Sequence, residues 1–303
     1  MNQEECKLCL KQKKLENSHI IPSFVINWLK KTSLTGHLRN PNDSNRRIQD
    51  GQKIKLLCRD CEAIFSTYES QFNRKIFMPY VNNHMDLSGE IVKDGSLKYD
   101  TWNLKFIISL QWRIFSLGME NFIRADNDPN PHTELIKKTN EHFRRYLNSE
   151  TTNTGNNNTY ILFLRNINNY NNVKQLDLSP KLNHYLIRSY DASFIYNNSQ
   201  LFYFSKIGPI AFITSILPNK LVGYPDSRVK LKGAISVIQK WLNEDLNHFI
   251  FVKRPKQMDL LRKKTENQKA QIEKAIGQNL HRKNDTMTLH VTYSDFLRSG
   301  IDD

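Results

Sequence analysis

Long hydrophobic runs are missing from this chain of 303 residues. The longest apolar stretch, residues 104–117, is interrupted by Lys105, Gln111 and Arg113 and is too short to cross a bilayer. The opening sequence, MNQEECKLCLKQKK, is charged where a secretory signal peptide would be apolar. We therefore interpret residues 104–117 as a buried helix and expect a cytoplasmic protein with no membrane association.

Several motif classes are absent as well. The sequence has no internal repeat, no glycine-rich loop of the kind that binds phosphates, and no serine or cysteine arranged as a catalytic nucleophile. No motif therefore names a role for the C-terminal half of the chain.

Acidic residues are in short supply, with 30 Asp and Glu against 44 Lys and Arg, for a formal net charge of +14. This excess favours a polyanionic partner, nucleic acid first and an anionic membrane surface second. Solubility alone also explains a basic composition, so charge does not decide the function. The 12 Tyr, 16 Phe and 4 Trp indicate a folded chain, and its length favours more than one domain.

Cysteine is scarce, and all four cysteines fall in two C-x2-C pairs, Cys6 with Cys9 and Cys58 with Cys61. In a reducing cytosol this pattern indicates metal binding rather than disulfides, and two such turns can offer four thiolates to a tetrahedral zinc ion. A closed four-sulfur site leaves no position for substrate, so we expect a structural zinc. The alternatives are a redox pair or two unrelated C-x2-C sequences.

Two short segments beside the cysteines carry candidate chemistry. The string Glu16-Asn17-Ser18-His19-Ile20-Ile21-Pro22 precedes a helical stripe of apolar residues, which places His19 at the edge of an extended segment. After Cys61, residues 62–72 form an amphipathic helix whose polar side carries Glu62 and Glu69. Two carboxylates on one side could hold Mg²⁺ or a similar cation, or could form an ordinary solvated face.

The order C-x2-C, SHIIP and LLCRDCE, running into a helix, resembles the zinc-stapled HNH (ββα-metal) endonucleases over about residues 4–75. In that family a strand pair and a helix grip one divalent ion over the scissile phosphate. The resemblance implies that His19 is the general base, that Glu62 binds a catalytic Mg²⁺ or Mn²⁺, and that Glu69 is an auxiliary ligand or supports the ligands.

The same comparison leaves an alternative open. Ser18 and Lys53 stand where the family usually has a metal ligand and an asparagine. A non-catalytic, zinc-stabilised module that binds nucleic acid or a protein therefore remains the alternative to an HNH endonuclease that hydrolyses phosphodiester bonds in DNA. The resemblance also implies an effector of bacterial restriction or anti-phage defence.

Basic residues gather between the two cysteine pairs. We expect them to contact the phosphates of DNA, with RNA as a second candidate. They are Arg39, Arg46, Arg47, Lys53, Lys55 and Arg59.

The rest of the chain predicts an α+β fold. Helices are expected at 99–122, 131–147, 232–249 and 255–277, and antiparallel strands at 160–165, 185–190, 194–196, 201–207 and 210–217. A polar segment at 149–158 is the best linker candidate. The resulting division is an HNH-like module over 1–85, a helical segment over 86–150, and an α+β domain over 151–303 that senses, docks a protein partner or forms an oligomer.

Overall fold

The computed structural model describes residues 3–39, 47–48, 50–124, 132–155, 157–170, 176–261, 270, 273–274 and 276–299. Within these ranges the backbone alone is described for residues 39, 47–48, 118–124, 260–261, 280 and 283. Arg46 lies outside the described residues.

The first 72 residues build a strand pair followed by a helix. Strand β3 (Leu15–His19) runs antiparallel to β6 (Lys53–Cys58), and α2 (Arg59–Phe72) begins directly after Cys58. Asp60 and Glu62 lie in the first turn of α2, where negative charge stabilises the helix N-terminus. Three smaller elements come before α2: the ribbon of β1 (Glu4–Glu5) and β2 (Gln12–Lys13), helix α1 (Ser23–Lys31), and the ribbon of β4 (Leu38–Arg39) and β5 (Arg47–Ile48).

The middle of the chain is mostly helical, as predicted. Two π-helical turns, η1 (Asn73–Phe77) and η2 (Tyr80–His84), continue α2, and they are followed by α3 (Trp102–Arg124) and α4 (Thr133–Leu147). Between η2 and α3, β7 (Ser96–Tyr99) pairs with β12 (Gly233–Ser236), which comes more than 130 residues later in the chain. The apolar stretch at 104–117 is indeed buried within α3 over most of its length.

A four-stranded antiparallel sheet forms the C-terminal half, in the order β8-β11-β10-β9. Its strands are β8 (Asn158–Phe163), β9 (Tyr190–Asn197), β10 (Gln200–Ile207) and β11 (Ile210–Leu217). The helices around it are α5 (Leu182–Arg188), α6 (Glu244–His248) with the π-helical turn η4 (Phe249–Lys253), α7 (Arg254–Leu261) and α9 (Met287–Ser299).

Two predicted elements are wrong. Residues 185–190 were expected as a strand, but most of them belong to α5, whose first backbone N–H groups are bound by Asp295 of α9. The helix expected at 232–249 is replaced by β12 and the short α6, because residues 233–236 pair with β7. Of the helix expected at 255–277, α7 covers the start, and residues 262–269 lie outside the described residues.

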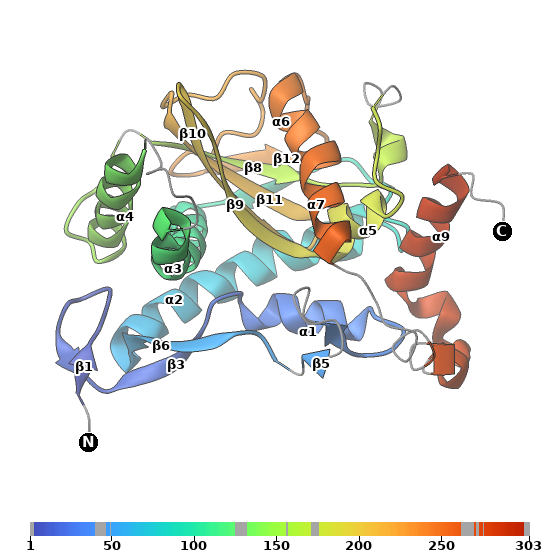
Figure 1. Ribbon diagram of the computed structural model, residues 1–303, viewed down its shortest axis with the longest axis horizontal. Coiled ribbons are helices and arrows are strands. Elements are labelled where there is room, and N and C mark those ends of the chain that lie inside the picture. Colours follow the sequence, from blue (N-terminus) through green and yellow to red (C-terminus); the bar gives the residue numbers. More distant parts are fainter. Residues whose placement is uncertain are drawn as a thin grey trace.

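The molecule is layered, with the strand pair β3–β6 and α1 along one side, α2 crossing the middle and the sheet on the other side (Figure 1). Phe72 of α2 stacks on Phe106 of α3 at 4.0 Å between ring centroids, and both rings contact Phe212 of the sheet. The mixed α+β character is confirmed. No helix in the described part of the chain is long and apolar enough to span a membrane.

Among the described residues, two hydrophobic clusters fill the interior, and each combines residues from all three predicted domains. The cluster that contains the cysteines, called the cysteine core here, joins the first cysteine pair to α2, α3, α4 and the sheet. Its members include Cys6, Leu8, Cys58, Phe65, Trp112, Phe143, Leu201 and Tyr203. The three-domain division stays a prediction, and the described packing is continuous across its boundaries.

Candidate functional site

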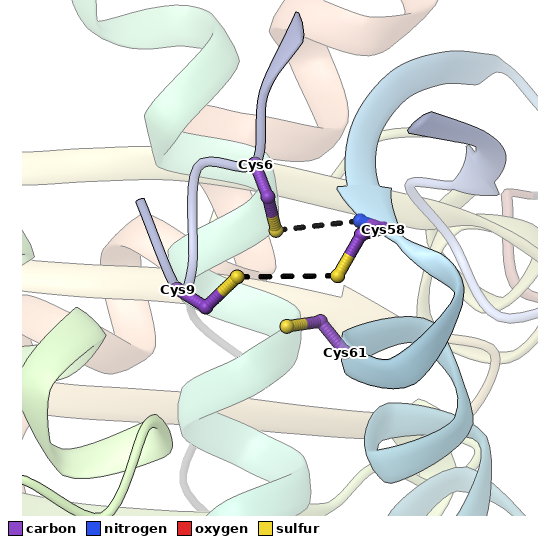
Figure 2. A group of neighbouring side chains, drawn as sticks. All are labelled: Cys6, Cys9, Cys58 and Cys61. Atoms are coloured by element: carbon purple, nitrogen blue, oxygen red, sulfur yellow. Dashed lines mark hydrogen bonds between the residues drawn. The ribbon is translucent and has the colours of Figure 1, made fainter. Parts of the chain in front are cut away.

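The four cysteines meet at one point, as their spacing predicts (Figure 2). Their sulfur atoms all lie within 4.8 Å of one another, and Cys9 Sγ is 3.9 Å from Cys58 Sγ. The β1–β2 turn supplies the first pair, while the end of β6 and the first turn of α2 supply the second. Within the described part of the chain, no other group of three or more His, Cys, Asp or Glu side chains comes as close together.

The electrostatics of this cluster favour a cation. Burial raises the pKa of the Cys61 thiol far above its usual range, and the neighbouring sulfurs add to the shift. Burial also raises the pKa of Cys9. Burial acts in the same direction on Cys6, but hydrogen bonds from backbone N–H groups outweigh it and lower the pKa of Cys6 to about 7. Four thiolates cannot share this volume without a positive charge, and a divalent cation that replaces the thiol protons provides it. The cluster can therefore hold a structural metal ion.

Helix α4 fixes the first cysteine turn from outside. Arg144 donates from Nη1 to the backbone oxygen of Leu8 at 2.9 Å, and its guanidinium also pairs with Glu141 and Glu150. Leu10 closes the turn with a φ of 59°, and its N–H donates to the Cys6 oxygen. Backbone and guanidinium together thus hold the loop that presents Cys6 and Cys9.

His19 forms a pair with an acidic residue that the sequence did not single out. Its Nε2 lies 2.9 Å from Asp50 Oδ1, and Lys53 Nζ lies 2.5 Å from the other carboxylate oxygen. Hydrogen bonds from Lys53 and His19 hold the pKa of Asp50 well below its usual value, so this carboxylate stays ionised near neutral pH. A carboxylate facing Nε2 keeps the imidazole proton on Nε2 and leaves the lone pair on Nδ1.

A buried arginine supports the His19 backbone. Arg113 of α3, whose side chain is 1% exposed, donates to the His19 backbone oxygen at 2.8 Å and to Glu69 Oε1 at 2.5 Å. Glu69 is thus engaged in an ion pair with Arg113, and both roles expected of it stay predictions. Gly51 packs beside the imidazole, and a Cβ there would lie 3.2 Å from Ile26.

Glu62 lies where the resemblance expects a ligand, but it makes a different contact. Ser18 Oγ donates to Glu62 Oε2 at 2.6 Å, and Ser18 is fully buried. Successive side chains of a strand point to opposite faces, so Ser18 faces α2 while His19 faces outward. The strand alternation therefore separates Glu62 from the His19–Asp50 pair.

The basic residues expected to bind phosphate are distributed unevenly. Lys53 and Lys55 lie on β6, paired with Asp50 and with Glu4 respectively, and Arg59 is exposed at the start of α2. Arg39 and Arg47 are opposed in the β4–β5 register.

Comparisons with protein-family models, with curated proteins and with solved structures found no match to this chain. The resemblance to HNH endonucleases therefore stays a prediction. It rests on the residue pattern at 4–75.

Two residues of the site, Asp50 and Arg113, escaped the sequence analysis. Asp50 precedes a glycine in a loop, and only the His19↔Lys53 register brings that loop to the imidazole. Arg113 was visible as a charge that interrupts an apolar helix. A buried charge requires a partner, so that interruption was the available indication of a polar network in the interior.

Proposed function

We propose that this protein is a zinc-stabilised endonuclease of HNH type that hydrolyses phosphodiester bonds in DNA. The observation that supports it most is the His19–Asp50 pair on the edge of a strand pair that leads into α2. A histidine oriented by a carboxylate is a common arrangement for a general base near neutral pH. The four-cysteine cluster supplies the fixed frame around it.

Zinc is the metal that fits the cysteine cluster best. Four thiolates in two C-x2-C turns form its usual closed structural site. The metal would join the β1–β2 turn to the start of α2 and so hold β3 and β6 in register. In this proposal it takes no part in the reaction.

His19 acts as the base through Nδ1. The imidazole accepts a proton from a water molecule as the water oxygen bonds to phosphorus, and the ionised Asp50 stabilises the resulting imidazolium. The bond from phosphorus to the leaving sugar oxygen breaks in the same displacement, and that oxygen takes a proton from solvent water. In the free protein Lys53 shares the same carboxylate. Arg113 holds the backbone that carries the imidazole.

Glu62 is the residue that would hold a catalytic Mg²⁺ or Mn²⁺. Magnesium keeps several waters and commonly binds through one or two carboxylates together with substrate phosphates, so a single carboxylate is a workable donor set. Such an ion would stabilise negative charge on the phosphate oxygens. Binding it at the phosphate beside His19 would require Glu62 to give up its hydrogen bond with Ser18 and to reach past β3 to the outward side of the strand pair.

One observation favours the alternative, a module that binds nucleic acid or a protein without cutting. The Ser18–Glu62 hydrogen bond satisfies both groups without an ion, and β3 separates them from His19. In this alternative, the cysteine cluster shapes a basic surface and His19 is an ordinary polar residue.

A cleavage assay with supercoiled plasmid distinguishes the two functions. Purified wild-type protein with Mg²⁺ or Mn²⁺ should convert the plasmid to nicked and linear forms, and the His19→Ala variant should not. Intact plasmid after incubation with wild-type protein, at protein concentrations that shift its mobility in a gel, would support binding without cleavage and reject the nuclease.

A further inference from the structure

The outward face of the strand pair β3–β6 is polar and basic. The register places Asn17 opposite Lys55 and His19 opposite Lys53, and residues opposed in this way point to the same side of a strand pair. Ser18 lies between Asn17 and His19 and points to the other side, toward α2. The face opposite α2 therefore carries Asn17, His19, Lys53 and Lys55, and we call these four residues the outer face.

Each lysine of the outer face is held by a carboxylate. Asp50 lies 2.5 Å from Lys53 Nζ, and Glu4 lies 3.3 Å from Lys55 Nζ. The lysine side chains are 41% and 59% exposed, and those of the carboxylates are about half exposed. Ion pairs this exposed contribute little to stability, so an arriving anion can replace the carboxylates at small cost.

From these features we infer that the sugar-phosphate backbone of a nucleic acid binds along the outer face, with its phosphates taking the place of Glu4 at Lys55 and of Asp50 at Lys53. Asp50 keeps its hydrogen bond to His19 through its other oxygen, so the imidazole stays oriented while Lys53 turns to the phosphate. This inference rests on the proposed nucleic-acid substrate and adds the surface that binds it.

The exposed pair of Lys55 and Glu4 allows a direct test by fluorescence anisotropy. A labelled DNA duplex is titrated in buffer without divalent cations, over a salt series. Lys55→Ala should weaken binding and reduce the slope of log K against log salt by about 1. Glu4→Gln should tighten binding roughly 1.5- to 5-fold at low salt, because it removes the competitor for Lys55.

A second lysine–glutamate pair, on α4, provides matched controls. Lys137 Nζ lies 2.8 Å from Glu134 Oε1, both side chains are exposed, and their charges are those of Lys55 and Glu4. Lys137→Ala and Glu134→Gln should leave affinity and salt slope unchanged. Equal effects of the Lys55 and Glu4 variants and of the Lys137 and Glu134 variants, or a tighter complex with anionic vesicles than with DNA, would overturn the inference.

The binding assay tests the outer face and the plasmid assay tests the nuclease, so either proposal can be rejected without the other. DNA binding with the expected Lys55 and Glu4 effects, but without plasmid cleavage, would support the outer face as the DNA-binding surface and reject the nuclease activity. Plasmid cleavage with a salt slope that Lys55→Ala does not change would retain the nuclease and remove the outer face as its binding surface.

Discussion

His19 is the residue on which the proposed chemistry depends most directly. His19→Ala should lower cleavage by about 10²- to 10⁴-fold, which is the usual contribution of a general base. Zinc content and DNA affinity should stay close to the wild-type values, because the base acts in the transition state. Single-turnover cleavage, metal analysis and anisotropy together test this, and a wild-type cleavage rate in the variant would remove His19 from the mechanism.

Asp50 should matter through the orientation of His19. Asp50→Asn keeps the shape of the side chain but loses the charge that holds both the imidazole and Lys53. We expect kcat to fall strongly, by up to about 10⁴-fold, because an amide can hold the imidazole in its other tautomer. DNA affinity should rise modestly, because Lys53 loses its competing carboxylate. The ¹⁵N shifts of the imidazole should also show a less populated Nε2–H tautomer. Unchanged shifts and rates would make the pair an incidental surface contact.

Glu62 is tested by its dependence on metal. If it binds the catalytic ion, Glu62→Gln should lower activity by weakening metal affinity, and excess Mn²⁺ should restore part of the activity. The His19→Ala variant should stay inactive at every metal concentration. An equal metal dependence of wild type and Glu62→Gln would instead indicate that Glu62 only accepts the Ser18 hydrogen bond.

At the residue scale, local spacing decided what the sequence could predict. Two residues between paired cysteines place both sulfurs on one turn, so the four-cysteine cluster was predictable and is confirmed as a cluster able to hold a metal. Asp50 and Arg113 reach His19 only through strand register and helix packing, which a linear pattern does not contain.

Helices α2 and α3 are joined by the ion pair of Glu69 and Arg113. Removing one partner of a buried pair leaves the other charge without compensation, so Glu69→Ala should lower the free energy of unfolding by about 3 kcal/mol. The control is Glu134→Ala on α4, whose exposed partner is Lys137 and whose effect should be within about 0.5 kcal/mol of zero. Urea denaturation measures both, and similar losses would show that the pair is not a structural link.

Helix α9 is attached to α5 through Asp295, whose carboxylate accepts hydrogen bonds from the backbone N–H groups of Asn183 and His184. Burial raises the pKa of Asp295 to about 6. The folded state therefore holds an extra proton between about pH 4 and pH 6, and wild type should gain about 1 kcal/mol over Asp295→Asn as the pH falls from 7 to 5. Urea denaturation at several pH values measures the free energy of unfolding of both proteins, and zinc content is checked at each pH. Parallel curves of unfolding free energy against pH for wild type and Asp295→Asn would contradict this.

At the element scale, the local residue pattern predicts an element correctly unless a contact with a distant segment favours another structure. Helices α3 and α4 were predicted because their apolar residues recur at helical spacing over many turns. Residues 185–190 are rich in β-forming residues, yet Asp295 binds the start of α5 from more than one hundred residues away in the chain. Strand β12 exists because β7 lies beside it, and that partner comes from the middle of the chain.

The whole molecule should respond to loss of the metal, because the cysteine core extends from the first cysteine pair to α3, α4 and the sheet. We expect one tightly bound zinc per chain, and chelation or Cys58→Ser should loosen helices far from the cysteines. Hydrogen exchange of α3 and α4, with the fluorescence of Trp112 beside Phe65, measures this. Purified protein without zinc, or a Cys58→Ser variant with wild-type exchange in both helices, would end the structural-zinc interpretation.

Three buried guanidinium groups that bind backbone oxygens of the first thirty residues have a consequence for biosynthesis. Arg113, Arg144 and Arg188 donate to the oxygens of His19, Leu8 and Leu29, and they come from α3, α4 and α5. During translation the cysteines and His19 leave the ribosome well before these arginines do. A nascent chain can therefore gather its metal early, yet the backbone beneath His19 is fixed only after the helical layer has been made. On the proposed function, cleavage is delayed until α3 has been synthesised.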